Sequence, residues 1–489
     1  MISDVNSSTS LNYSLNQFCK DIANGKYYVL SINLQENGNI IAALQLELHN
    51  FKDKSNSVMS NKSIENFIEK QNFKFEGRSW ARFNIMLVSF LGFCRDVNPW
   101  SIWDSCDLIF QFYQDFNNCL INDSYPLDPL VPIFRNMTEY VLPIASKLDA
   151  NCLRIGTKKN QFLSFASSVI SKLFNSVKPS RTNDGNVIQS GDLIDFPQKQ
   201  KILLYLVNKL NNIYFRIDSP QLCFNVFKNF KPKSMITEFG VYPIKEQIEY
   251  KYLLGRYYLL NGRVINAFVQ LNDAYTRLRN LCDKCNLYGH DQVRRNLLRI
   301  LRYLIPTGLM IGKLPKFEMI TQIDVSLSDK YANLSQTLKT GNVKGLNIWL
   351  KSHERELCER HLLVIQLEKL PMICYRNLVR SIVRQCIIPQ NSGKIPYSTV
   401  HDALKISIGD PSNDSDEHFD IYNGIHRSRN VENVLVTLIN LGFLRGNCFP
   451  QLKLCVVKKT ALIQEVLPSI EGRILSSFAL NDDDSWLND

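Results

Sequence analysis

The chain has 489 residues and a formal net charge of +11, and 45% of its residues are hydrophobic. One hydrophobic core rarely organises so long a chain, so two or three packed units or one elongated stack of repeats are expected. The apolar content excludes a chain that is disordered throughout. No apolar run approaches the roughly 20 residues of a membrane span, and the polar start lacks the features of a secretory signal, so an intracellular protein is expected.

Residues 1–25 are polar and rich in Asn and Ser, which predicts a disordered N-terminus. In residues 26–177, apolar residues recur at i, i+3, i+4 and i+7, a pattern typical of amphipathic helices that pack as repeats. The clearest of these helices are 82–95, 105–116, 132–148 and 161–177. Residues 178–197 concentrate Ser, Asn, Asp, Gly and Pro, which indicates a linker loop.

Residues 198–366 are predicted to continue as helices, with a hairpin of two helices, 247–260 and 264–280, that turns at Asn261 and Gly262. The hairpin matches the tetratricopeptide (TPR) template at Leu254, Gly255, Tyr258, Ala267, Leu271 and Ala274. Such a repeat either packs on its neighbours or offers a peptide-binding groove, and packing is the expectation. The predicted architecture is a TPR-like α-solenoid.

Residues 367–465 show a different pattern. Three helices, at 371–386, 397–406 and 430–441, are accompanied by two short β-like runs, at 442–444 and 452–457. Three helices and a β-hairpin wing predict a winged helix. The protein is therefore expected to be mainly α, with a TPR-like α-solenoid followed by a winged-helix subdomain.

Two acidic segments accompany the winged helix. Residues 410–420, between its second and third helices, are too polar to pack and predict a mobile loop. The acidic C-terminal tail, 466–489, ends with Trp486 and Leu487. The end of the tail is expected to fray, and a small docking motif is the alternative.

The cysteines and histidines predict neither a metal site nor a cofactor. Thirteen cysteines lie at irregular spacings, mostly inside apolar segments, where they act as small buried hydrophobes with reduced thiols. Cys282 and Cys285 have ligand-like spacing, and His290 follows, but zinc requires four ligands and no second pair lies nearby.

Long segments of the chain resemble a known family. The runs at 203–223, 250–272, 367–378 and 431–442, with 96–110 and 448–460, are similar to the fungal PCI-domain subunit of the second transcription-and-export complex. The resemblance covers roughly residues 15–470. It implies a helical repeat joined to a winged helix, the layout of PCI scaffolds.

The resemblance also implies a function and partners. The family implies a nuclear complex at the pore that couples transcription to messenger RNA export. Its implied partners are a large PCI-containing export scaffold subunit, a very small acidic disordered subunit shared with the proteasome lid, and RNA and possibly DNA. Two winged helices side by side are implied to bind the nucleic acid jointly.

The winged helix carries the candidate nucleic-acid residues. Residues 371–409 and 421–460 contain eleven Lys or Arg against two acidic residues, and Arg376, Arg380 and Arg384 recur every four residues as one helical stripe. The full predicted set is Arg376, Arg380, Arg384, Lys394, Lys405, Arg427, Arg429, Lys453, Lys458 and Lys459. The alternative is a PCI scaffold of the signalosome or proteasome-lid type that binds proteins without touching nucleic acid.

A second basic region lies in the solenoid. Residues 199–313 contain 19 Lys or Arg against 7 Asp or Glu, so they call for an anionic partner, either nucleic acid or a very acidic protein. An extended acidic peptide is expected there, because a solenoid offers a long curved face. The predicted contacts are Arg256, Arg263, Arg294, Arg295, Arg299 and Arg302.

The sequence lacks the motifs of catalysis. It contains no phosphate-binding G-x-x-x-x-G-K-S/T loop, no G-x-G-x-x-G and no H-E-x-x-H, and its seven His residues are dispersed. A protein that is not an enzyme is expected.

Overall fold

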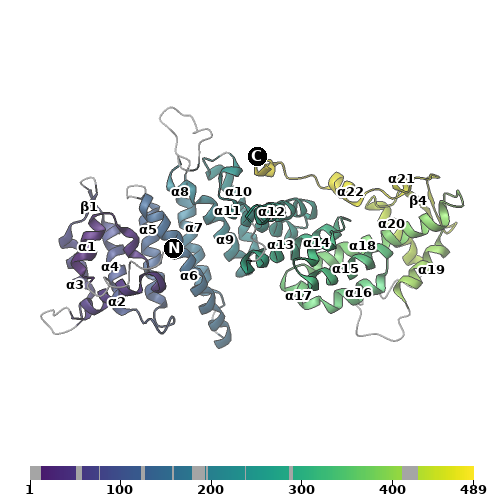
Figure 1. Cartoon of the computed structure of the whole chain (residues 1–489). Coiled ribbons are helices and arrows are strands. Elements are labelled where there is room, and N and C mark those ends of the chain that lie inside the picture. Colours follow the sequence, from purple (N-terminus) through teal and green to yellow (C-terminus); the bar gives the residue numbers. More distant parts are fainter. Residues whose placement is uncertain are drawn as a thin grey trace, which may run out of the picture. The chain divides into compact units, whose positions relative to one another are not determined.

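The computed structural model describes residues 13–50, 58–75, 78–122, 127–156, 159–178, 193, 196–236, 238–285, 290–409 and 428–488. Almost all of its elements are helices, which Figure 1 colours along the chain. The chain divides into two units, one within residues 1–246 and one within 247–488. None of the described helices combines the length and the apolar character that crossing a membrane requires.

The first unit consists of helices and one small strand pair. Its elements are α1 (Leu15–Ala23), η2 (Tyr27–Leu30), α2 (Leu34–Asn50), α3 (Asn61–Gln71), β1 (Lys74–Phe75), β2 (Arg78–Ser79), α4 (Ala81–Asp96), α5 (Cys106–Ile121), α6 (Leu127–Ile155), α7 (Gln161–Ser176), α8 (Gln198–Lys201), α9 (Leu203–Arg216), η4 (Pro220–Leu222), α10 (Cys223–Lys233) and η5 (Phe239–Val241). Aromatic rings fill the core: Tyr113 stacks on Phe134 with ring centroids 5.4 Å apart. The helices predicted between residues 82 and 177 are confirmed.

The predicted disorder of residues 1–25 is wrong from residue 13 onward. Ser14 caps α1, because its side chain accepts a hydrogen bond from the Gln17 N–H at 3.1 Å. Phe18 and Ile22 are buried, and Phe18 stacks on Phe90 with centroids 5.6 Å apart. Apolar burial therefore outweighs the polar composition that suggested disorder. Residues 1–12 lie outside the described residues, as do most of the predicted linker at 178–197 and all of the acidic loop at 410–420.

The second unit holds the TPR-like hairpin and the winged helix. Its elements are α11 (Ile244–Leu260, whose first turn belongs to the first unit), α12 (Val264–Cys285), α13 (Asp291–Met310), α14 (Phe317–Thr321), α15 (Val325–Thr340), α16 (Val343–Ser352), α17 (Glu354–Glu359), α18 (Leu363–Ile382), the π-helix η6 (Val383–Ile387), β3 (Lys394–Pro396), α19 (Tyr397–Ile408), α20 (Ser428–Asn440), β4 (Gly446–Phe449), β5 (Leu454–Val457), α21 (Ile463–Val466), α22 (Ile470–Ser477) and the 3₁₀ helix η8 (Asp482–Asn488).

The predicted hairpin of α11 and α12 is confirmed, including its turn at Gly262, which has a φ of +69°. Gly255 permits the close approach of the two helices, because a Cβ there would lie 2.6 Å from the Leu271 Cγ. Leu271, Ala267 and Ala274 are fully buried. Small residues at the signature positions therefore do what the template predicted, which is to pack the hairpin.

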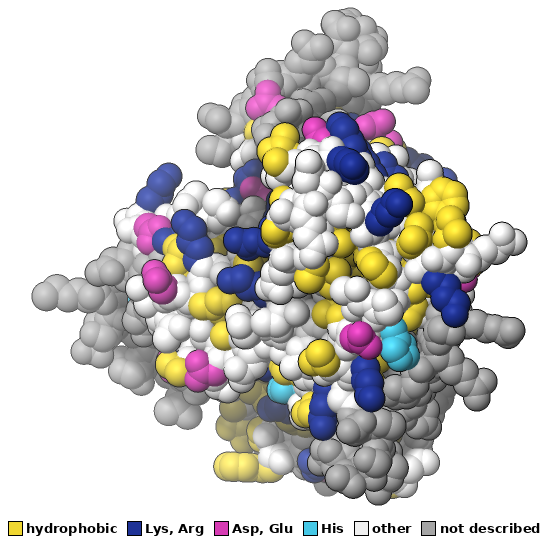
Figure 2. Space-filling view, turned by 90° about the vertical axis from the view of Figure 1, so that its right-hand side faces the viewer, with side chains coloured by type: hydrophobic (Ala, Val, Ile, Leu, Met, Phe, Trp, Pro, Cys, Tyr) yellow, Lys and Arg dark blue, Asp and Glu magenta, His cyan; other side chains and the backbone are white. Residues whose placement is uncertain are grey.

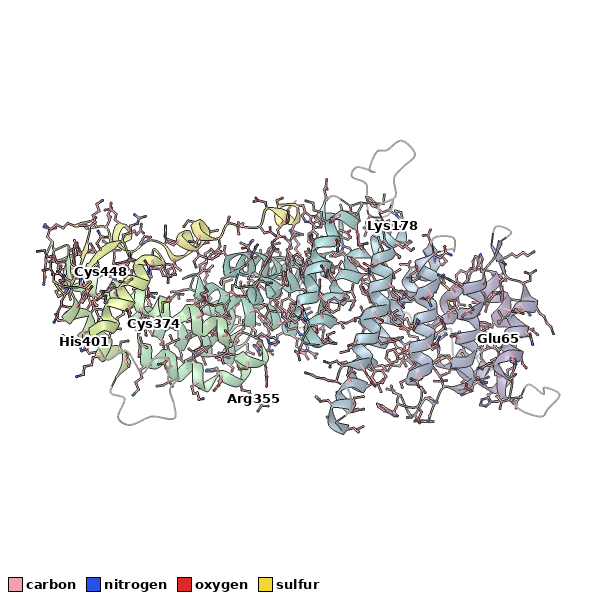
Figure 3. The ribbon with its side chains drawn as sticks, turned by 180° about the vertical axis from the view of Figure 1, so that it is seen from behind. Glu65, Lys178, Arg355, Cys374, His401 and Cys448 are labelled. Carbon is pink, nitrogen blue, oxygen red and sulfur yellow. The ribbon has the colours of Figure 1, made fainter. Side chains whose placement is uncertain are left out.

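The winged helix contains α18, α19 and α20 and a three-stranded antiparallel sheet in the order β3-β5-β4. Figure 3 shows His401 of α19 and Cys448 of β4 in this part of the chain. The strand predicted at 442–444 is wrong: Gly442 ends α20 with a φ of +70°, and the wing strand begins at Gly446. The short strand β3 was not predicted from the sequence. The first helix begins at Leu363, so the predicted boundary at residue 367 falls inside a continuous helix.

All thirteen cysteines are free, and nine of them are buried. This confirms the prediction of buried thiols. Cys282 is buried and Cys285 is exposed. Among the described residues, no three His, Cys, Asp or Glu side chains gather as a metal site would require.

Candidate nucleic-acid interface

Two of the predicted cations are exposed where α18 ends and the following π-helix packs on the sheet of the winged helix. Arg380 lies in the last turn of α18, and Arg384 lies in the π-helix that follows; both are exposed. The π-helix packs on β3, and the Ser392 N–H donates to the Ile387 carbonyl oxygen at 3.2 Å. Arg384 is therefore held beside the strand that carries Lys394.

Lys394 and Lys459 lie at the same end of the sheet. Lys394 is paired with Val456 of β5, and the Val457 N–H donates to the Gly393 carbonyl oxygen at 2.7 Å. A Cβ on Gly393 would lie 3.1 Å from the Lys459 Cγ, so the Lys459 side chain runs across this glycine next to Lys394. We call Arg380, Arg384, Lys394 and Lys459 the basic edge.

The basic edge suits a polyanion. All four side chains are exposed, and none of them forms an ion pair within the described part of the chain. Figure 2 looks onto the winged-helix side of the molecule, where blue Lys and Arg side chains are spread among apolar and polar ones and magenta acidic side chains are fewer. A phosphate backbone would meet little repulsion on this surface.

Three predicted lysines lie apart from the basic edge or are partly neutralised. Lys458 pairs with Glu465 at 2.8 Å, and its hydrogen bond and charge lower the pKa of this carboxylate. Lys453 lies in the β4–β5 turn, at the opposite end of β5, where its carbonyl oxygen accepts the Tyr397 N–H at 2.9 Å. Lys405 is exposed on α19. Lys453 therefore lies away from the basic edge, and Lys458, although next to Lys459 in the sequence, already has a carboxylate partner.

Arg376 is a structural residue rather than part of an open stripe. Its guanidinium donates to the carbonyl oxygens of Pro468 at 2.9 Å and Leu467 at 3.4 Å, and to the Asn377 side chain at 3.0 Å. Burial lowers the pKa of Arg376 to about 10, so the group stays charged at neutral pH and needs these acceptors. The helical spacing that predicted a stripe did not reveal that the segment after the wing crosses this position.

We expect Arg376→Ala to lower the free energy of unfolding by about 1–3 kcal/mol, because two buried carbonyl groups lose their donor. Arg380→Ala, one turn further along the helix, is the matched control. It is expected to change the free energy of unfolding by less than about 0.5 kcal/mol. Chemical denaturation of both variants measures the difference. Equal destabilisation by the two changes would contradict the structural role of Arg376.

The two arginines predicted ahead of the third helix, α20, cannot be placed on a surface from the described residues. Arg427 lies outside the described residues, and Arg429 lies in α20 with a side chain that is not described. The exposed face further along α20 is uncharged and carries Asn433, Thr437 and Asn440. Amides and hydroxyls contact phosphates or bases without a net charge, so this face fits a nucleic acid less strongly than the basic edge.

Arg445 was missed. It is exposed just before β4, and its backbone N–H donates to the Val466 carbonyl oxygen at 2.8 Å. In the sequence it is a single cation in an apolar run, so nothing in the local pattern marked it. Its position at the start of the wing became clear only from the fold.

The arginines predicted to meet an acidic partner lie on α11, on α13 and at the turn between α11 and α12. Arg256 of α11 lies over two tyrosine rings, with its Cζ 5.0 Å from the centroid of Tyr303 and 5.7 Å from that of Tyr252. Burial raises the pKa of Tyr252, and the charges of Arg256 and Arg299 oppose the rise. The charge of Arg299 therefore also acts on this phenol.

The remaining arginines of that set lie on α13 or at the hairpin turn. Arg295 and Arg299 are exposed one turn apart, and Arg302, three residues further, is half-buried. Arg294 points elsewhere and donates to the Ile323 carbonyl oxygen at 2.9 Å. Arg263 lies at the turn, where its charge acts on Asp484 in the last residues of this chain.

The groove between α18 and α19 has a volume of about 630 Å³ and is lined by apolar side chains such as Leu378, Ile382 and Ile406. Among its lining residues, a thiol comes only from Cys386 and a carboxylate only from Asp402. No lining residue is a His that could activate the thiol. The groove offers no set of groups to which a reaction could be assigned.

Comparison with known proteins identifies the family. No family model matches the chain. The chain is 47% identical over 474 residues to the nuclear mRNA export protein THP1 of Saccharomyces cerevisiae, covering 96% of this chain and 99% of that protein. It is 27% identical over 312 residues to the PCI domain-containing protein 2 homolog of Dictyostelium discoideum, covering 64% of this chain and 62% of that protein. With the enhanced ethylene response protein 5 of Arabidopsis thaliana the identity is 23% over 467 residues, covering 95% of this chain and 96% of that protein. The resemblance seen in the sequence is thus confirmed, and the chain belongs to the family of PCI-domain proteins that includes yeast THP1.

Proposed function

We propose that this protein is a non-catalytic scaffold of nuclear messenger RNA export that also binds nucleic acid through its winged helix. The export role rests on the identity of 47%, along 96% of the chain, to a protein named for nuclear mRNA export. The scaffold role is supported by the confirmed fold, in which helical repeats lead into a winged helix. The nucleus, and its periphery at the pore, is the proposed location.

Nucleic-acid binding is supported by the basic edge. Arg380, Arg384, Lys394 and Lys459 are exposed on neighbouring elements and can meet successive phosphates. Cations that contact phosphates do not read bases, so the proposed binding is largely independent of sequence. Single-stranded RNA is the proposed ligand, with DNA as a second one.

The proposed protein partners are a large PCI-containing export scaffold subunit and a very small acidic disordered subunit. For the acidic subunit, the surface formed by α11 and α13 is the better candidate, because Arg295 and Arg299 are exposed there and Arg256 lies over the rings of Tyr252 and Tyr303. Apolar anchors between the helices would then supply affinity, and the charges would mainly speed the encounter.

The export role is tested by complementation. Expressed in Saccharomyces cerevisiae cells that lack THP1, the chain is expected to restore export of polyadenylated RNA from the nucleus, measured by in situ hybridisation. A variant with the basic edge reversed to Glu is expected to enter the nucleus but to restore export only partly. Nuclear retention of RNA at full expression of the unchanged chain would contradict the proposal.

The acidic-partner surface is tested by a pair of neighbouring arginines. Arg295→Glu combined with Arg299→Glu is expected to weaken binding of the acidic subunit at least about tenfold, because two attractive charges become repulsive. Arg294→Glu is the matched control, since Arg294 lies next to Arg295 but points to the Ile323 carbonyl group. Calorimetric titration measures the affinity of the unchanged chain and of both variants for the acidic subunit. An equal loss of affinity in the Arg294 variant and in the double variant would contradict the assignment of this surface.

A further inference from the structure

The last residues of the chain return from the winged helix to the TPR-like hairpin. α22 follows the winged helix, and the 3₁₀ helix η8 ends beside α11 and α12, where Figure 1 marks the C-terminus. The expected fraying of this tail is wrong for residues 481–488. The alternative, a small docking motif, describes the structure, because Trp486 and Leu487 are buried.

α22 forms the first attachment of the tail. The Ile470 side chain lies against Gly312, where a Cβ would be 2.9 Å from the Ile470 Cδ1. Lys313 pairs with Glu471 at 2.8 Å. Beyond α22, Phe478 and Leu480 are exposed by 66% and 46%, so the connection to η8 contributes little packing.

Lys251 of α11 provides the centre of the second attachment. Its side chain is fully buried, and its ammonium donates to the Leu487 carbonyl oxygen at 2.8 Å and pairs with Asp273 of α12. A buried ammonium needs several acceptors, and the tail supplies one of them from 236 residues away in the sequence. Burial lowers the pKa of Lys251, and the Asp273 carboxylate opposes this effect.

Tyr258 binds the acidic part of the same segment. Its hydroxyl donates to the Asp484 carboxylate and accepts a hydrogen bond from the Asn481 side chain at 2.9 Å. The charges of Lys251 and Arg263 favour the ionised Asp484, although burial raises its pKa overall. The hairpin therefore presents the Tyr258 phenol and the charges of Lys251 and Arg263 to the Asp484 carboxylate. The Lys251 ammonium also donates to the Leu487 carbonyl oxygen.

We propose that the α11–α12 hairpin is a docking site for an acidic peptide with a Trp-Leu anchor, and that residues 481–488 of the same chain are its occupant. The TPR-like hairpin thus binds a peptide, in addition to packing on its neighbours. The site recognises charge and the two apolar anchors. Asp484 accepts a hydrogen bond from Tyr258 and is favoured by the charge of Arg263. Trp486 and Leu487 are buried, and the Leu487 carbonyl oxygen accepts from Lys251 of the hairpin. Because the peptide is part of the chain, its effective concentration at the site is high, on the order of millimolar.

The test is hydrogen exchange of the full-length chain. Trp486→Ala combined with Leu487→Ala is expected to raise amide exchange in residues 248–262 at least tenfold, because the peptide leaves the hairpin. Phe478→Ala combined with Leu480→Ala is the matched control, since both side chains are exposed in the same tail, and it is expected to leave this exchange unchanged. Equal exchange in the two double variants would overturn the proposal.

Addition of the peptide separates docking from general destabilisation. A synthetic peptide of residues 478–489 is expected to restore protection of residues 248–262 in the Trp486/Leu487 variant, and the same peptide with Trp486→Ala is not. Failure of the unchanged peptide to restore protection would overturn the assignment of the site. In the unchanged chain, protection of residues 248–262 from hydrogen exchange is expected to be independent of protein concentration. Protection that rises with concentration would mean that the tail of a second copy occupies the site, and it would overturn binding within one chain.

Discussion

Replacing Gly341 with Ala is expected to lower the free energy of unfolding by about 2–5 kcal/mol, the sum of left-handed backbone strain and overpacking. Gly341 ends α15 with a φ of +73°, and a Cβ there would lie 2.7 Å from the backbone nitrogen of Leu378 in α18. Its carbonyl oxygen also accepts the Ser407 hydroxyl of α19 at 2.6 Å. Gly341 therefore lies where the helical repeats join the winged helix. The backbone of α18 that faces it is rigid and cannot move to make room for a Cβ.

Gly262→Ala is the matched control for this change. Gly262 has a φ of +69°, but nothing lies within 4 Å of the position that a Cβ would take. Its replacement is expected to cost about 1–2 kcal/mol from backbone strain alone. Denaturant titration gives the free energy of unfolding of both variants, and their difference measures the clash with α18. The same decrease in both variants would contradict the close approach at Gly341.

Reversal of the basic edge is expected to weaken binding of single-stranded RNA on the order of a hundredfold at low salt, because four phosphate contacts become repulsive. The variant carries Arg380→Glu, Arg384→Glu, Lys394→Glu and Lys459→Glu. The slope of log affinity against log salt concentration is expected to become shallower by about 3, since each lost contact contributes about 0.7. Fluorescence anisotropy over a salt series measures both quantities.

The control for net charge carries the same number of reversals elsewhere in the second unit. Lys284, Lys339, Lys351 and Arg355 are exposed and lie away from the sheet of the winged helix. Their replacement by Glu is expected to change affinity much less than reversal of the basic edge. Equal losses for the two quadruple variants would mean that total charge, and not the basic edge, attracts the RNA. The loss of RNA affinity on reversal of the basic edge is also expected to be similar for RNAs of different sequence.

The sequence predicted the α11–α12 hairpin well because its signature depends on residue types at fixed spacing. Gly255, Ala267 and Leu271 specify one close helix pair, and the structure realises it. The wing was predicted less well. Phe443 and Leu444 look like a strand, but they are buried immediately after the turn at Gly442. The three-residue strand β3 is too short to show a period of two.

Contacts between distant segments explain the errors in the candidate site. Arg376 has the spacing of its neighbours Arg380 and Arg384, yet its donors meet carbonyl groups 91 and 92 residues further along the chain. The π-helix that begins at Val383 also changes the register of the helix before Arg384. The acidic end of the tail was expected to fray, and only the fold shows that Trp486 is buried.

The connection between α22 and η8 also acts as a mechanical tether. Only residues 478–481 separate Ser477 from Asp482, and an extended chain spans at most about 3.5 Å per residue, or about 18 Å over this connection. α22 lies against the end of α20, since a Cβ on Gly442 would meet the Arg473 guanidinium. While η8 stays docked, a force that pulls on the winged helix is passed through this tether to α11 and α12. The junction at Gly341 then bears only part of the load.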